Sequence, residues 1–206
     1  MTKENPHKSV NFSRRRPTRL EKETFMIICE GENTEPEYFK SFRLSSATIK
    51  TISYPNKGNA VNFVNAAIAE KNKRGNYFDN YWVVFDMDAN SKQNFNSAIQ
   101  LAKANKLEVA YSNQAFEFWY LLHFSYIQCK IHRRLYKRKL DELLPFTYDK
   151  DKDTAKKMYA ALLSKQSDAI VNATNVYDEI GNHQSPADEE SSTTVYKLVE
   201  ALNKFL

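Results

Sequence analysis

The stretch YWVVFDMD at residues 81–88 carries the clearest structural signal in the chain, because five apolar residues lead directly into Asp86 and Asp88. A short apolar run that ends abruptly in polar residues is typical of a strand buried on both faces of a sheet. The run TFMIICE at residues 24–30 repeats the pattern and ends in Glu30. Both runs are therefore predicted to be central strands that are followed by carboxylates.

Helical and strand-like patterns alternate around these two runs. Strand alternation covers 47–54 and 107–111, and helical spacing of apolar residues covers 34–42, 61–68 and 95–102. This alternation predicts an α/β fold with a mostly parallel sheet covered by helices on both faces. Functional groups in such sheets lie just beyond the carboxyl ends of the strands, where Glu30, Asp86 and Asp88 fall.

The domain organisation is predicted from the change of pattern along the chain. Residues 1–22 are basic and aperiodic, so we expect a disordered tail. Residues 23–206 are expected to form one domain, in which a helical elaboration occupies about 113–185 before a final amphipathic helix. No apolar run approaches the roughly 18 residues of a membrane span. Two cysteines do not suggest a disulfide framework, so a reducing, cytoplasmic location is expected.

Basic residues are concentrated in two places. The tail holds seven basic and two acidic residues, which accounts for the whole net charge of +5. The second concentration lies at 130–139 and supplies four predicted nucleic-acid-binding residues: Arg133, Arg134, Lys137 and Arg138. Basic segments can bind phosphates by releasing counterions. A tail that only aids solubility and a solvated helix face are the alternative interpretations.

The carboxylates at the strand ends predict a metal site. A carboxylate beside an apolar strand is unfavourable unless it is paired, protonated or bound to metal. Mg²⁺ (or Mn²⁺) prefers oxygen ligands and needs only two or three carboxylates. Asp86 and Asp88 are two residues apart, so on an extended backbone they are expected to point the same way. A bound ion could orient a phosphate and activate water, with Glu30 as a ligand or proton carrier.

Four further acids have competing interpretations. Glu32 is predicted either to join the metal site or to lie near the start of a helix. Glu117 interrupts the apolar run FEFWYLLHF at 116–124, and it is predicted either to join the metal site or to bond a backbone group near the preceding turn. Glu35 and Glu37 are assigned to the start of a helix, where the helix dipole favours negative charge. The predicted site residues are therefore Glu30, Asp86, Asp88 and Glu117.

Four blocks in the same order resemble the RloB-like family. They are ICEGENTEPEYF at 28–39, VVFDMDAN at 83–90, SNQAFEFWYLLHF at 112–124 and SSTTVYKLVEAL at 191–202. That family is considered a variant of the Toprim fold, the catalytic domain of topoisomerases, bacterial primases and overcoming-lysogenization-type nucleases. The resemblance implies that Glu30 matches the Toprim glutamate, a general acid or base, and that Asp86 and Asp88 match its magnesium-binding pair. The usual Toprim domain is about half this length, so the helices at 113–185 go beyond it.

The resemblance also implies a biological setting. Related Toprim effectors cleave nucleic acid, in some cases tRNA, under the control of an ABC/AAA-type ATPase in anti-phage or abortive-infection loci. We therefore expect a Mg-dependent nuclease acting on RNA or DNA, with an ATPase partner encoded nearby. A non-catalytic adaptor that binds the ATPase or nucleic acid is the alternative. A haloacid-dehalogenase-type phosphatase is a further one, because VVFDMDAN looks like its nucleophile motif. That motif normally opens the first strand and has Thr or Val where Asn90 stands. The oligomeric state stays open, with a homodimer among the options.

Overall fold

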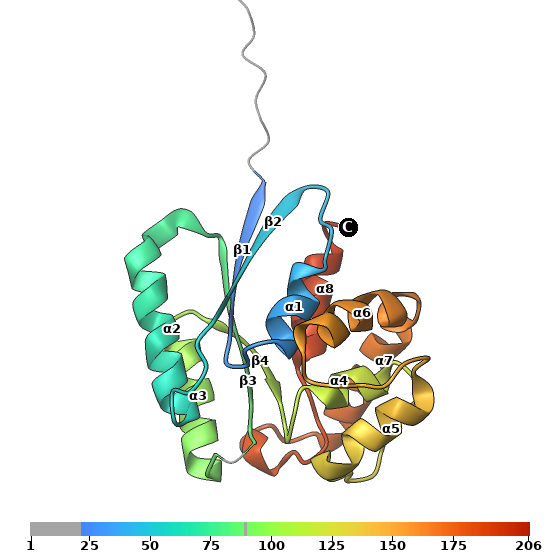
Figure 1. Cartoon of the computed structure of the whole chain (residues 1–206). Coiled ribbons are helices and arrows are strands. Elements are labelled where there is room, and N and C mark those ends of the chain that lie inside the picture. Colours follow the sequence, from blue (N-terminus) through green and yellow to red (C-terminus); the bar gives the residue numbers. More distant parts are fainter. Residues whose placement is uncertain (1–21, 89) are drawn as a thin grey trace, which may run out of the picture.

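The computed structural model describes residues 22–88 and 90–206 (Figure 1). Nearly all of the predicted disordered tail therefore lies outside the described residues. Within them, the chain folds around a four-stranded sheet in the order β2-β1-β3-β4. The strands are β1 (Glu23–Cys29), β2 (Ala47–Ser53), β3 (Asn80–Asp86) and β4 (Glu108–Ser112). All three neighbouring pairs are parallel, which confirms the α/β fold with β1 and β3 at the centre.

Helices cover both faces of the sheet (Figure 1). On one face lie α2 (Ala60–Arg74) and α3 (Lys92–Ala104), and on the other lie α1 (Thr34–Lys40) and α8 (Val195–Asn203). Alternate residues of β1 enter opposite cores, with Ile27 on the α1 side and Ile28 on the α2 side. Burial on both faces explains why β1 and β3 are almost continuously apolar.

The helical elaboration packs on the α1 side of the sheet. It contains α4 (Glu117–Leu122), α5 (Tyr136–Leu143), α6 (Lys152–Leu162) and α7 (Gln166–Ile180). Short 3-10 turns lie at Gly75–Tyr77, Arg133–Leu135, Leu163–Lys165 and Pro186–Asp188. The indole N–H of Trp119 in α4 donates to the Tyr38 hydroxyl of α1 at 3.0 Å, inside one shared aromatic core. The added helices therefore extend the core of the sheet.

The segment before α8 completes the edge of the sheet. Ser112, at the end of β4, forms an antiparallel bridge with Thr193. The amide of Thr194 donates to the Tyr111 carbonyl at 2.8 Å. This segment fixes the polar loop 181–192 beside the carboxyl ends of β3 and β4. Along residues 22–88 and 90–206, no helix combines the length and the apolar character needed to cross a bilayer.

Candidate metal and phosphate site

The parallel pairing of β1 and β3 brings two predicted residues together. Cys29 pairs with Val84, and the amide of the next residue, Glu30, donates to the Val84 carbonyl at 2.9 Å. Glu30 therefore follows β1 at the level where β3 ends in Asp86. Both residues line a cavity of about 330 Å³, together with Asp88. The strand-end positions thus bring these three predicted residues to one place.

Asp86 is partly buried and connects β3 to the start of α4. Its Oδ2 accepts a hydrogen bond from the Phe116 amide at 3.0 Å. Burial raises the pKa of Asp86 well above its ordinary value, and the charges of Glu35 and Glu117 raise it further. Burial also raises the pKa of Glu30, and the Asp86 backbone amide partly offsets this effect. Both carboxylates would be stabilised by a cation.

Glu35 belongs to the same cavity, which the sequence interpretation missed. It lies in the first turn of α1, as expected, but its side chain is directed inward and the residue is only 6% exposed. A Cβ atom at Gly31 would collide with the Glu35 carboxylate, so the glycine leaves the space that this carboxylate fills. Burial, followed by the charges of Glu117 and Glu30, raises the pKa of Glu35 from 4.5 to about 7. Glu35 is therefore a buried acid in the cavity as well as a helix-start residue.

Asp88 differs from the expectation in its backbone. Its φ is 39°, a left-handed turn conformation, so the premise that Asp86 and Asp88 share an extended backbone was wrong. The Asp88 side chain is 52% exposed and forms an ion pair with Arg133. It still lines the carboxylate cavity, and it also lines a second cavity of about 410 Å³. Asp88 is thus shared by the linings of the two cavities.

Glu117 is buried and already has partners. Its Oε1 accepts a hydrogen bond from the Tyr148 hydroxyl at 2.8 Å and lies 2.7 Å from the Lys150 ammonium nitrogen. Neither partner belongs to the turn before α4, so the backbone interpretation of Glu117 was wrong. Lys150 lines the carboxylate cavity from the loop before α6, and the Asn33 side chain donates to its carbonyl at 3.3 Å. This cation was also missed, because it is distant in sequence from the strand ends.

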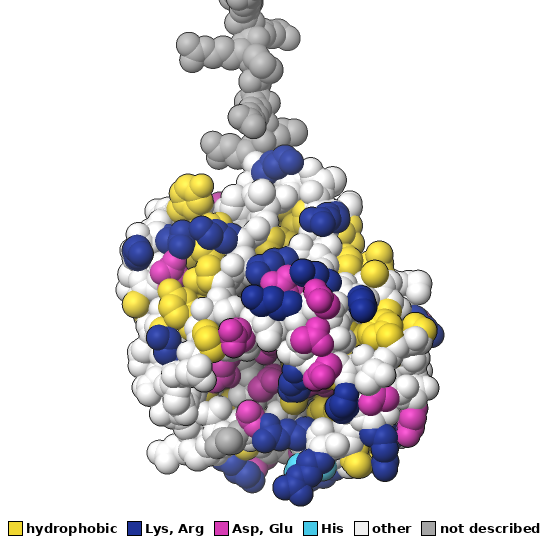
Figure 2. Space-filling view, in the orientation of Figure 1, with side chains coloured by type: hydrophobic (Ala, Val, Ile, Leu, Met, Phe, Trp, Pro, Cys, Tyr) yellow, Lys and Arg dark blue, Asp and Glu magenta, His cyan; other side chains and the backbone are white. Residues whose placement is uncertain are grey.

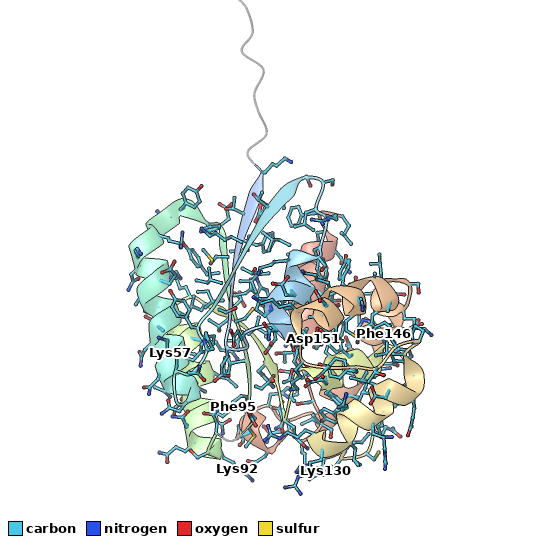
Figure 3. All side chains as sticks on the ribbon, viewed as in Figure 1. Lys57, Lys92, Phe95, Lys130, Phe146 and Asp151 are labelled. Atoms are coloured by element: carbon cyan, nitrogen blue, oxygen red, sulfur yellow. The ribbon has the colours of Figure 1, made fainter. Side chains whose placement is uncertain are left out.

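The second cavity is lined by five basic side chains, four of which come from the segment 130–134, together with three acidic and four uncharged residues. Its titratable lining residues are Asp88, Lys92, Lys130, His132, Arg133, Arg134, Asp188 and Glu190. Lys92 and Lys130, which reach it from different segments, both lie at the lower end of the molecule (Figure 3). On the face of the molecule shown in Figure 2, acidic side chains lie in a hollow, with basic side chains above and below them.

The four predicted nucleic-acid-binding residues separate in space. Arg133 and Arg134 line the second cavity, and with Lys137 they also line a third one of about 270 Å³ beside Glu117. Lys137 donates to the Tyr148 carbonyl. Arg138 lies on the exposed surface of α5, where it pairs with Glu142 at 3.9 Å. The structure therefore brings Arg133, Arg134 and Lys137 to the site but not Arg138.

The carboxylates supply the oxygen donors that a divalent metal prefers, but their arrangement is not that of a metal site. Among the described residues, no group of three or more His, Cys, Asp or Glu side chains converges closely enough to hold an ion. Three of the carboxylates have partners within the protein: Asp86 accepts from Phe116, Asp88 pairs with Arg133, and Glu117 pairs with Lys150. The hard oxygen donors suit Mg²⁺ or Mn²⁺, and the ion would require some of these contacts to exchange.

Comparison with known proteins agrees with the sequence blocks. A family model described as RloB-like protein matches residues 25–202. No curated protein and no solved structure matches the sequence. The matched region contains every residue that lines the three cavities. The chain belongs to the RloB-like family.

Proposed function

We propose that this protein is a metal-dependent nuclease that hydrolyses phosphodiester bonds in RNA or DNA. One observation carries the proposal: Glu30, Glu35, Asp86 and Asp88 line one cavity, and a second cavity that contains five basic side chains adjoins it at Asp88. Carboxylates that hold a divalent ion beside cations that hold phosphate are the two requirements of metal-assisted phosphodiester hydrolysis. Mg²⁺ or Mn²⁺ would polarise the phosphate and activate water.

The side chains would have separate tasks. Glu30, Glu35 and Asp86 would hold the ion, and Asp88 would complete the set. Glu30 would also move a proton, because burial raises the pKa of its carboxyl above the ordinary value and so makes it a stronger base. Glu117 would position Lys150 at the cavity. Its predicted role as a direct metal ligand stays a prediction.

The test uses a substitution that preserves the fold. Asp86→Asn keeps an oxygen that can accept from the Phe116 amide, so it removes the charge without removing that hydrogen bond. The control is Asp153→Asn, because Asp153 is 85% exposed and lines none of the three cavities. Both variants and the wild type are incubated with single-stranded DNA, plasmid and total tRNA, with Mg²⁺, Mn²⁺ or a chelator.

Metal-dependent cleavage that Asp153→Asn retains and Asp86→Asn loses would support the nuclease. Uncut substrates that stay bound under every condition, with an ATPase partner present, would contradict it and favour a non-catalytic adaptor. The Asp88–Arg133 ion pair favours that alternative, because it occupies one predicted metal ligand. Phosphate release from small phosphoesters would instead indicate a phosphatase.

We also propose control by an ABC/AAA-type ATPase in anti-phage defence. The proposal rests on the resemblance to Toprim effectors and on the family match. Its test is co-expression with ATPases encoded beside the gene, followed by co-purification and measurement of the cleavage rate with ATP. A specific complex whose cleavage rate depends on ATP would support it, and a cleavage rate unchanged by every neighbouring ATPase would contradict it.

A further inference from the structure

The ion pair between Asp88 and Arg133 lies where the three cavities meet. Asp88 lines the carboxylate cavity and the second cavity, and Arg133 lines the second and third cavities. The two residues come from different parts of the chain, the turn after β3 and the 3-10 turn Arg133–Leu135. Arg133 therefore holds the carboxylate of Asp88, which borders both the proposed metal ligands and the second cavity.

This ion pair is easily exchanged. The side chain of Arg133 is 42% exposed and that of Asp88 is 52% exposed, so water competes with the contact. An exposed ion pair of this kind favours the paired state over the separated state by only about two- to fivefold. The Arg133 backbone is fixed more firmly, because its amide donates to the Gln114 side chain at 2.8 Å. The guanidinium can therefore turn away from Asp88 while the turn that carries it stays in place.

A phosphate in the second cavity would be a better partner for Arg133 than Asp88 is. A guanidinium binds phosphate through two parallel hydrogen bonds, which are stronger than a single exposed contact. Among the described residues, the other cations of this cavity differ in availability: Lys92 pairs with Asp188, Lys130 pairs with Glu190, and Arg134 has no ion pair. Arg133 and Arg134 are adjacent and line the same cavity, so both can contact one phosphate.

We propose that Arg133 couples the binding of the nucleic-acid backbone to the binding of the divalent ion. A backbone phosphate that enters the second cavity takes Arg133 from Asp88, and the released carboxylate joins the metal ligands. The phosphate also neutralises a positive charge that would otherwise repel the ion. This inference rests on the proposed function. By thermodynamic reciprocity, phosphate binding and metal binding strengthen each other by the same factor.

The coupling is measured with the full chain and a substrate that resists cleavage. Mn²⁺ binding is followed by electron paramagnetic resonance, with and without single-stranded RNA or DNA oligonucleotides whose linkages are phosphorothioates. Bound oligonucleotide is expected to tighten Mn²⁺ binding to the wild type by at least about two- to fivefold, the factor that the lost ion pair represents. Arg133→Gln is expected to bind Mn²⁺ more tightly than the wild type without oligonucleotide, and to show no further gain when oligonucleotide binds.

Two variants serve as controls. Arg74→Gln also removes one ion pair and one positive charge, but its partner Glu70 lies on α2, and Arg74 lines none of the three cavities, so wild-type coupling is expected. Arg133→Lys keeps the charge without the paired hydrogen bonds, so we expect weak Mn²⁺ binding and a reduced coupling. Far-ultraviolet circular dichroism verifies that each variant is folded.

The outcomes separate this inference from the proposed function. Equal Mn²⁺ affinity with and without bound oligonucleotide, or normal coupling in Arg133→Gln, would overturn the inference and leave the metal site standing. Failure of the oligonucleotides to bind would do the same. Absence of Mn²⁺ binding, or equal Mn²⁺ binding by Asp86→Asn, would overturn the metal site and the inference together.

Discussion

Replacement of Glu35 by glutamine is expected to stabilise the protein at alkaline pH and to change little at acid pH. The pKa of this carboxyl is about 7 in the folded protein and ordinarily 4.5, and burial is the main cause. Below pH 4.5 the group is protonated in both the folded and unfolded states, so its ionisation does not change the free energy of unfolding. Between pH 4.5 and 7 only the unfolded chain releases the proton, so the wild type loses stability as the pH rises.

The size of this loss follows from the same two pKa values. Each pH unit between 4.5 and about 7 lowers the free energy of unfolding by about 1.4 kcal/mol, so the full loss above pH 7 is about 3 kcal/mol. Glutamine has no charge to bury, so Glu35→Gln avoids this loss. We therefore expect the variant to be more stable than the wild type by about 2–3 kcal/mol at pH 8 and by less than about 0.5 kcal/mol at pH 4.5.

Urea unfolding in the presence of a chelator measures both values. Glu37→Gln is the matched control, because Glu37 lies in the same turn of α1 but pairs with Lys40 outside the cavity. Its effect is expected to stay below about 1 kcal/mol at both pH values. Adding Mg²⁺ at pH 8 should stabilise the wild type more than Glu35→Gln, since the ion offsets the buried charge. A Glu35→Gln variant that is less stable than the wild type at pH 8, or equally changed at both pH values, would refute the reasoning.

Three other substitutions test the site. Gly31→Ala should displace the Glu35 carboxylate and weaken Mn²⁺ binding roughly 10- to 100-fold without loss of helical circular dichroism; unchanged binding would contradict the packing argument. Lys150→Met should lower the free energy of unfolding by about 1–3 kcal/mol, because the buried Glu117 carboxylate loses its cation. Glu117→Gln in the same chain should restore most of that free energy. A loss of stability that Glu117→Gln does not reduce would contradict the pairing. Glu30→Gln should slow nucleic-acid cleavage by about 10²–10⁴-fold with little change in substrate binding, and a rate within threefold of wild type would exclude Glu30 from proton transfer.

The central part of the fold could be predicted because strands that are buried on both faces of a sheet have a recognisable sequence pattern. A strand such as β3 shows it as an uninterrupted apolar run that ends at a carboxylate. The position of Glu30 beside Asp86 could be predicted too, because parallel strands end at the same edge of a sheet. These inferences need only local pattern and the geometry of parallel pairing.

The rest of the site depends on tertiary packing that no local pattern records. Glu35 has an ordinary helix-start position, and the missing side chain at Gly31 leaves room for its carboxylate inside the cavity. Lys150 reaches the cavity because α5 and α6 pack against α4 and α1, bringing a distant loop to Glu117. The basic segment 130–139 does not form a single helix face, because the chain becomes helical only at Arg133, in a 3-10 turn, and α5 begins at Tyr136. Arg133 and Arg138 consequently lie in different surroundings.

The proposed function requires the strand-end carboxylates to hold a divalent ion. Its most direct test is anomalous X-ray diffraction from crystals of the full chain grown with Mn²⁺ and a phosphorothioate oligonucleotide. We expect an anomalous peak inside the cavity bounded by Glu30, Glu35 and Asp86, with Asp88 released from Arg133. Well-ordered crystals without a peak in that cavity, or with manganese only at other places, would contradict it.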